Sequence, residues 1–236
     1  MSIPTIFDWL ERLEPFRGSP AVMIVLVTAS LIALFWDWRL ALLALTIQYL
    51  AVTLLFADLL DPRLAIVKLL VGMFVGLILY MTARQVHYGQ IPDDLTAEEF
   101  ARIKQENKRY PVWRWTVSRD FVIRAVATTL AILLIFFLTQ LSSFRLPGVP
   151  EELPHINRAI LILMSLGLVG VAASRDPIPA GMGLFTFLTG FELYYAAMDQ
   201  SIAMLAALAA LNLAIALAIA YLAQARRASW YALIDD

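Results

Sequence analysis

The sequence predicts an all-α polytopic integral membrane protein with about seven transmembrane helices. Of its 236 residues, 61% are hydrophobic and only 16% are charged, whereas a soluble domain is about half apolar and about a quarter charged. The long apolar runs are apolar on all sides, which is typical of helices surrounded by lipid rather than of helices with one apolar stripe. The charges are also segregated, because the largest group of basic residues lies between Arg84 and Arg124.

Seven apolar runs are close to the length that a bilayer requires, since about 20 helical residues cross the ~30 Å hydrocarbon core. They lie at residues 20–36, 40–57, 64–83, 120–141, 158–173, 177–198 and 202–223. The runs form a three-helix part over 19–83 and a four-helix part over 120–225, which closes with a hairpin over 177–223. Trp36 and Trp38 close the first run, where tryptophan is expected at the membrane–water interface.

Three segments are expected to lie outside the lipid core. Residues 1–18 combine apolar residues at helical spacing with charged ones, which predicts a short helix at the membrane surface. Residues 84–119 form a polar cytoplasmic loop with a short helix, because Thr96 and Glu99 have the spacing of a capping box. This loop is either a solvated connection or a docking surface for a soluble partner subunit. Residues 226–236 form a polar tail.

The distribution of basic residues predicts the orientation of the chain. Seven spans place one group of basic residues on the same face as the 84–119 loop: Arg39, Arg84, Arg102, Lys104, Lys108, Arg109, Arg114, Arg119, Arg175, Arg226 and Arg227. The opposite face has fewer: Arg12, Arg17, Arg63, Arg145 and Arg158. Because basic loops stay in the cytoplasm, we expect a multi-pass protein of the inner (plasma) membrane with its N-terminus outside and its C-terminus in the cytoplasm.

The composition excludes several classes of function. The chain has no cysteine, so disulfides, iron–sulfur ligation and zinc–thiolate sites are excluded. Its two histidines, His87 and His155, fall in predicted loops, which excludes a haem held between histidines at membrane depth. The net charge of −1 argues against nucleic-acid binding. No nucleophile–base pair, phosphate-binding loop or metal cluster is evident, so we predict no catalytic residue, cofactor or metal.

A few polar residues inside the spans are the candidate functional residues. Glu192 is the strongest, because intramembrane carboxylates usually mark functional sites; it either faces the bundle interior as a proton-relay or gating group or reaches the outer water near Asp199. Lys68 is expected to snorkel toward the outer interface near Asp61, with pairing to Glu192 or to a partner subunit as the alternative. Asn212 is a further candidate for an ion pathway.

Other polar residues are more simply explained by structure. Asn212 and Gln48 are expected to form hydrogen bonds between helices. Asp58 and Asp199 fall at predicted outer turns, where solvation suffices to explain them. The Gly-x-x-x-Gly spacing of Gly72 and Gly76 is typical of closely packed membrane helices.

The C-terminal third resembles the K subunit of respiratory complex I and its relative, the C subunit of multisubunit cation/proton antiporters. The residues that carry this resemblance are Arg175 in a basic turn, the string Gly190-Phe191-Glu192 followed by small residues, and the basic end at Arg226 and Arg227. The resemblance implies three spans, with the glutamate in the second.

Over more of the chain, about residues 40–85 and 158–227, the sequence resembles the E component of formate-hydrogenlyase-type hydrogenases. Lys68, in a span that ends at Ala83-Arg84, carries this part of the resemblance. Two departures bear on function. Glu192 lies seventeen residues after Arg175 instead of about ten, and Asn212 stands where the third K-type span carries a second glutamate, so the resemblance does not imply a complete proton relay.

Two hypotheses of function follow. In the first, the chain is a non-redox membrane-arm subunit of a complex I-like, hydrogenase-like or antiporter-like assembly, in contact with other membrane subunits and contributing to proton or cation translocation. In the second, it is a structural membrane anchor that docks a soluble partner or stabilises a larger membrane complex without moving ions.

Overall fold

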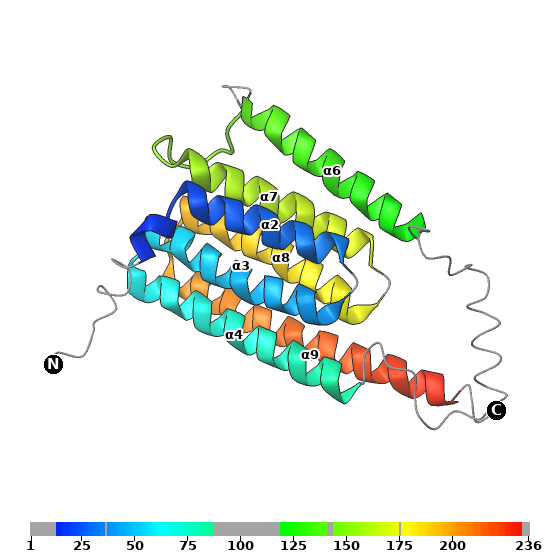
Figure 1. The fold of residues 1–236 in the computed structure, drawn as a ribbon. Helices are drawn as coiled ribbons and strands as arrows, with labels where there is room; N and C mark the ends of the chain where they lie inside the picture. The colour runs from blue at the N-terminus through cyan, green and yellow to red at the C-terminus, as the bar shows by residue number, and fades with distance from the viewer. Residues whose placement is uncertain (1–12, 36, 87–118, 141–143, 175, 233–236) are drawn as a thin grey trace.

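The computed structural model describes residues 13–35, 37–86, 119–140, 144–174 and 176–232, without side-chain detail for 119–120 and 227–232. Within these residues the chain forms one 3₁₀ turn and seven α-helices (Figure 1): η1 (Glu14–Phe16), α2 (Ser19–Leu34), α3 (Trp38–Leu59), α4 (Pro62–Gln85), α6 (Arg119–Gln140), α7 (Pro154–Ala172), α8 (Pro177–Met198) and α9 (Ile202–Ala232). The all-α prediction is confirmed, and a helix occupies each of the seven predicted positions.

The helix starts are encoded by short polar and proline signals. Asp37 caps α3 by accepting a hydrogen bond from the Arg39 amide at 2.9 Å, and Asp61 caps α4 by accepting one from the Arg63 amide at 2.8 Å. Proline occupies the first turn of α2, α4, α7 and α8, where its missing N–H costs nothing and its fixed φ suits a helix.

Two boundaries differ from the prediction. Helix α7 begins at Pro154 rather than at residue 158, so the prediction that His155 lies in a loop is wrong. The run Pro154-His155-Ile156-Asn157 is not apolar enough to be recognised as membrane-spanning, but proline at N1 starts the helix there. Helix α9 continues to Ala232, well past the predicted end of the last span at residue 223.

Helix α8 lies at the centre of the bundle. Figure 1 shows the helices running roughly side by side, and α8 contacts α2, α3, α7 and α9. Helices α2, α3 and α4 are neighbours in chain order, and α9 closes the bundle against α4 and α8. Helix α6 lies at the edge, where it packs against α7 and α2.

The outside of the bundle carries many large apolar side chains. Phe136 and Phe137 are each 63% exposed, and Met23 and Leu43 are each 61% exposed, which would be unfavourable for so many large side chains in water. Among the described residues, five helices, α3, α4, α6, α7 and α9, are long and apolar enough to cross a membrane. Helix α2 has only 16 residues, and α8 carries Glu192 together with several glycines, prolines and threonines. The fold is that of a polytopic membrane protein.

The closest helix packing occurs between α7 and α8. A Cβ atom added at Gly183 would lie 2.6 Å from the Val171 backbone nitrogen and 2.7 Å from the Gly170 carbonyl carbon. One added at Gly190 would lie 2.7 Å from Leu163 Cβ. Small residues at a membrane helix interface allow backbones to approach in this way, so glycine is required at both positions.

The predicted Gly-x-x-x-Gly contact is only half realised. Gly72 packs against the ring of Tyr49, with no room for a Cβ atom, whereas a Cβ atom at Gly76 would meet nothing closer than 3.6 Å. The predicted surface helix over 1–18 falls mostly outside the described residues, and the predicted helix within 84–119 lies outside them.

Candidate functional site

Two separate apolar clusters fill the bundle, one toward each end. The first includes Val25, Leu55, Leu163 and Leu193, and the second includes Leu45, Val75, Phe185 and Ala216, together with their neighbours. Between the clusters lies a set of buried or largely buried polar side chains, which we call the polar layer: Gln48 of α3, Lys68 of α4, Thr186, Thr189 and Glu192 of α8, and Asn212 of α9. Each polar residue lies, along its own helix, between residues of the two clusters.

Glu192 is the centre of the polar layer. Its side chain is only 4% exposed, and it forms an ion pair with the ammonium group of Lys68, which is 10% exposed. Its other carboxylate oxygen accepts a hydrogen bond from Asn212 Nδ2 at 2.6 Å. The three candidate residues predicted from the sequence are therefore brought together by α4, α8 and α9.

The observed pairing corrects the expectation that Lys68 snorkels to the interface. Lys68 lies six residues after Pro62, about 9 Å along α4, and Glu192 lies six residues before Met198, about 9 Å from that end of α8. Because α4 and α8 are antiparallel, the two side chains reach the same depth and meet in the interior. The alternative in which Glu192 reaches the outer water near Asp199 does not hold, since the carboxylate is buried.

The polar layer continues along α8 from Glu192. Thr186, Thr189 and Glu192 are three residues apart, so they lie along one face of the helix. Thr186 Oγ1 accepts a hydrogen bond from Gln48 Nε2 at 3.3 Å, as expected for a polar contact between helices. Gln48 Oε1 has no hydrogen-bond partner among the described residues, and a buried group of this kind commonly binds a water molecule.

Tyr49 adds an aromatic surface to the same region. The Lys68 ammonium lies 5.4 Å from the centroid of the Tyr49 ring, which is within the range of a cation–π interaction. Tyr49 is itself buried and packs over Gly72. Sequence analysis missed this residue, although the glycine four residues after Lys68 indicates that a bulky group from a neighbouring helix is accommodated there.

A cavity of about 240 Å³ adjoins the ion pair between α4 and α9. Lys68, Glu192 and Asn212 line its polar wall, and the rest of its lining is apolar and includes Leu64, Val67, Ile202 and Leu205. In the opposite direction, the apolar cluster of Leu45, Val75, Phe185 and Ala216 separates the polar layer from the far end of the bundle. Within the described residues, the polar groups thus do not form a continuous path between the two ends.

The chemistry of the site follows from burial. Two opposite charges out of water stabilise one another, and the loss of either leaves the other without compensation in a medium of low dielectric constant. Protonation or movement of Glu192 is therefore coupled to Lys68. Asn212 holds the carboxylate by a hydrogen bond but cannot itself exchange a proton.

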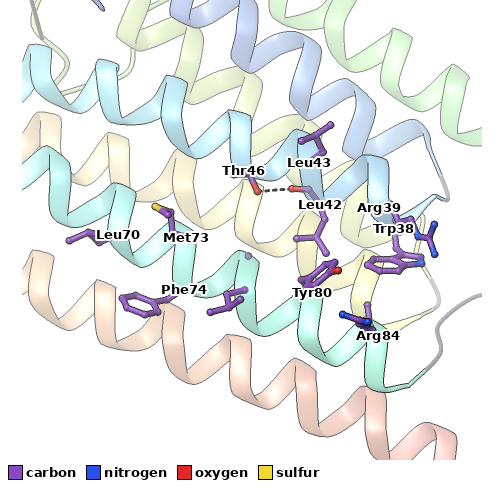
Figure 2. A pocket seen from close by; sticks show the side chains of 13 residues that line it. Trp38, Arg39, Leu42, Leu43, Thr46, Leu70, Met73, Phe74, Tyr80 and Arg84 are labelled. Atoms are coloured by element: carbon purple, nitrogen blue, oxygen red, sulfur yellow. Dashed lines mark hydrogen bonds between the residues drawn. The ribbon is translucent and has the colours of Figure 1, made fainter. Parts of the chain in front are cut away.

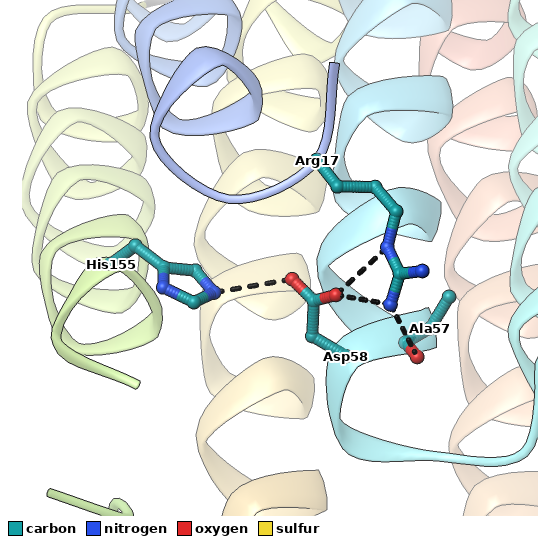
Figure 3. A network of polar contacts seen from close by, with 4 residues as sticks. All are labelled: Arg17, Ala57, Asp58 and His155. Atoms are coloured by element: carbon teal, nitrogen blue, oxygen red, sulfur yellow. Dashed lines mark hydrogen bonds and ion pairs between the residues drawn. The ribbon is translucent and has the colours of Figure 1, made fainter. Parts of the chain in front are cut away.

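A second polar network lies at the end of the bundle where α3 ends (Figure 3). Asp58 Oδ1 accepts hydrogen bonds from Arg17 Nε at 3.0 Å and Nη2 at 2.6 Å, and its Oδ2 lies 3.1 Å from His155 Nε2. Asp58 is only 11% exposed, so the expectation that solvation alone explains it is wrong. The network ties the segment before α2 to the end of α3 and the start of α7, which is a structural task.

Sequence analysis also missed Arg124, which lies inside the predicted fourth span. The whole residue is only 2% exposed. It donates to the Ala173 carbonyl at 2.5 Å and the Ala33 carbonyl at 3.5 Å, near the C-terminal ends of α7 and α2. Arginine often satisfies the last carbonyls of a helix in this way. The sequence did contain a signal for Arg124, because a charged residue within a long apolar run often has a specific role.

No group of histidine, aspartate and glutamate side chains suited to holding a metal occurs among the described residues. In comparisons with known proteins, the sequence matches no protein-family model, no curated protein and no solved structure. Functional inference therefore rests on the polar layer and on the residues themselves.

Proposed function

We propose that this chain is a non-redox membrane-arm subunit of a complex I-like, hydrogenase-like or antiporter-like assembly, and that Glu192 and Lys68 take part in proton or cation movement driven by partner subunits. The observation that supports this proposal best is the buried Lys68–Glu192 ion pair, held by Asn212 between two apolar clusters. Intramembrane ionisable residues are expensive to bury, and they commonly mark ion or proton pathways.

A role as one subunit among several agrees with the limits of the site. The apolar cluster beyond Phe185 blocks a polar route to the far end of the bundle, so transport requires a rearrangement or polar groups from a neighbouring subunit. The exposed apolar faces of α4 and α9 beside the cavity supply room for such a neighbour. We further propose the plasma membrane as its location, with the N-terminus outside and the C-terminus cytoplasmic.

The test is ion transport by the intact assembly in membrane vesicles carrying Glu192→Gln. This substitution keeps the shape of the side chain and its contact with Asn212 but removes the charge. We expect the assembly still to form, although less stably because Lys68 loses its charged partner, and we expect coupled proton or cation transport per assembled complex to be strongly impaired. Glu151→Gln is the matched control, because Glu151 is a carboxylate with an 84% exposed side chain. Normal transport in the Glu192→Gln vesicles would remove the proposal for the site.

The second candidate function is a structural membrane anchor that moves no ions. The observation in its favour is that the polar layer links α3 to α8 and joins α4, α8 and α9, which is what structural hydrogen bonds between helices would do. In this case deletion of residues 90–110 should release a soluble partner while the helices remain folded, and Glu192→Gln should leave transport unchanged.

A further inference from the structure

A large groove lies on the outer face of the α3–α4 hairpin (Figure 2), and Glu192 is not among the residues that line it. Its volume is about 1000 Å³, at the upper end of the range of about 300–1,000 Å³ that is usual for ligand sites. The groove has a charged end and an apolar body. One end is lined by Arg39, Arg84, Trp38 and Tyr80, and the body is lined mainly by Leu, Met and Phe side chains.

The charged end lies where the hairpin leaves the apolar region. Arg39 is the second residue of α3 and Arg84 is the second-last residue of α4, so the two helices of the hairpin each place one arginine at the same end of the groove. Both side chains are exposed, and neither forms an ion pair with a described carboxylate. This end of the groove therefore carries two positive charges, with Trp38 drawn between them (Figure 2).

The aromatic residues fix one of these charges in place. The Arg39 guanidinium carbon lies 5.4 Å from the centroid of the Trp38 ring, and the Trp38 and Tyr80 rings are 6.1 Å apart. Asp37 uses its carboxylate to cap α3 through the Arg39 amide. Paired arginines of this kind are well suited to bind the oxygens of a phosphate group, and tryptophan and tyrosine are enriched at the level of the headgroups.

The body of the groove matches an acyl chain. Along α4 the lining extends from Arg84 back to Leu70, about 21 Å at 1.5 Å per residue, which exceeds the ~15 Å half-thickness of the hydrocarbon core. Leu70, Met73, Phe74 and Leu77 are each at least half exposed. Thr46 Oγ1, a polar side-chain atom in this body, already donates to the Leu42 carbonyl at 2.9 Å, so it does not require a polar ligand.

We infer that this groove is a binding site for one anionic phospholipid, with its phosphate held by Arg39 and Arg84 beside Trp38 and with an acyl chain lying along the groove between α3 and α4. The site does not depend on the proposed role of Glu192. A phosphate without acyl chains would leave the apolar body empty, and a zwitterionic lipid would place a positive group near two arginines. An anionic phospholipid places its phosphate at the charged end and an acyl chain in the apolar body.

The experiment is native mass spectrometry of the full-length chain, delipidated in detergent and then titrated with phosphatidylglycerol or phosphatidylcholine. We expect one tightly retained phosphatidylglycerol and at least about tenfold weaker retention of phosphatidylcholine. The double variant Arg39→Gln/Arg84→Gln should lose about tenfold or more in affinity for phosphatidylglycerol. Arg63→Gln/Arg158→Gln, which removes two exposed arginines at the other end of the bundle, should bind like the wild type.

A second variant tests the apolar body with the arginines left in place. Gly76 lines the groove, and a Cβ atom there meets nothing within 3.6 Å, so Gly76→Leu fills the groove without a clash at its base. It should reduce lipid retention although both charges remain. If the double arginine variant does not fold, the binding measured with Gly76→Leu tests the location of the site by itself.

Three results would overturn the inference. Equal retention of the two lipids would remove the charge-specific site, and unchanged binding by both Arg39→Gln/Arg84→Gln and Gly76→Leu would remove this location. Competition by inorganic phosphate at the same concentration as the lipid would show a plain anion site. Because these experiments measure lipid retention and not ion transport, their outcome is independent of the Glu192→Gln experiment.

Discussion

Lys68 of α4 pairs with Glu192 of α8 across 124 residues of sequence, and Asn212 of α9 completes the contact. The pair fixes three helices at one depth in the bundle. Because neither charge reaches bulk water, it also makes the region sensitive to any change in protonation or in helix position. The same feature thus has a structural and a functional consequence, and experiments are needed that separate them.

The glycine contacts between α7 and α8 predict opposite effects for two similar substitutions. Gly183→Ala places a methyl group 2.6 Å from the Val171 backbone nitrogen, so the helices must separate; we expect a loss of about 1–3 kcal/mol, as for other overpacked sites. Gly76→Ala meets nothing within 3.6 Å and should leave stability unchanged or slightly raised. Thermal unfolding in detergent measures both. Equal stability of the two variants would contradict the packing described for α7 and α8.

Arg124 is predicted to hold α6 against the bundle. Among the described elements, α6 packs mainly against α7 and α2, and the Arg124 side chain binds carbonyls near the ends of both. Arg124→Gln should therefore loosen α6 without unfolding the remaining helices. Because the chain has no cysteine, spin labels can be placed at Val126→Cys and Leu168→Cys, which replace exposed residues on α6 and α7.

The measurement is the distribution of distances between the two labels by pulsed electron paramagnetic resonance. A narrow distribution in the otherwise native chain should broaden with Arg124→Gln. Arg145→Gln serves as the control, because Arg145 forms an exposed pair with Glu151, and such pairs contribute about 0–1 kcal/mol. The role assigned to Arg124 is wrong if its variant and the control give the same narrow distribution.

Asp58 is predicted to matter more than its neighbour Asp61. Asp58→Asn removes the charge that Arg17 and His155 share, and we expect a loss of about 1–3 kcal/mol, as for a mostly buried charged hydrogen bond. Asp61 caps α4 through the Arg63 amide, and asparagine is an equally good cap, so Asp61→Asn should be nearly neutral. Unfolding by SDS in mixed micelles compares the two, and a larger effect at Asp61 would contradict the network.

The sequence predicted the helices well, because apolar runs and their boundaries are local properties. The turn residues Asp61-Pro62 and Asp176-Pro177 mark two helix starts directly. The start of α7 at Pro154 was missed because His155 and Asn157 interrupt the apolar pattern. Both side chains form hydrogen bonds at that end of the bundle, His155 with Asp58 and Asn157 with the Leu146 amide.

The candidate site was predicted only in part. Glu192, Lys68 and Asn212 were each recognisable as polar groups in apolar runs, but whether Lys68 turned to the interface or to Glu192 depended on the packing of α4 beside α8 and α9. No property of the local sequence contains that information. Tyr49 was missed for the same reason, since an aromatic residue in a membrane span is most simply explained by contact with lipid.

The most direct test of the central claim is a double-mutant cycle on Lys68 and Glu192, measured as the free energy of unfolding of Lys68→Met, Glu192→Leu and the double variant in mixed micelles. Each single variant leaves one buried charge uncompensated and should lose about 3–5 kcal/mol. The double variant should lose clearly less than the sum of the two, because neither charge remains. Losses that simply add would show that the two side chains do not interact, and would contradict the account of the polar layer.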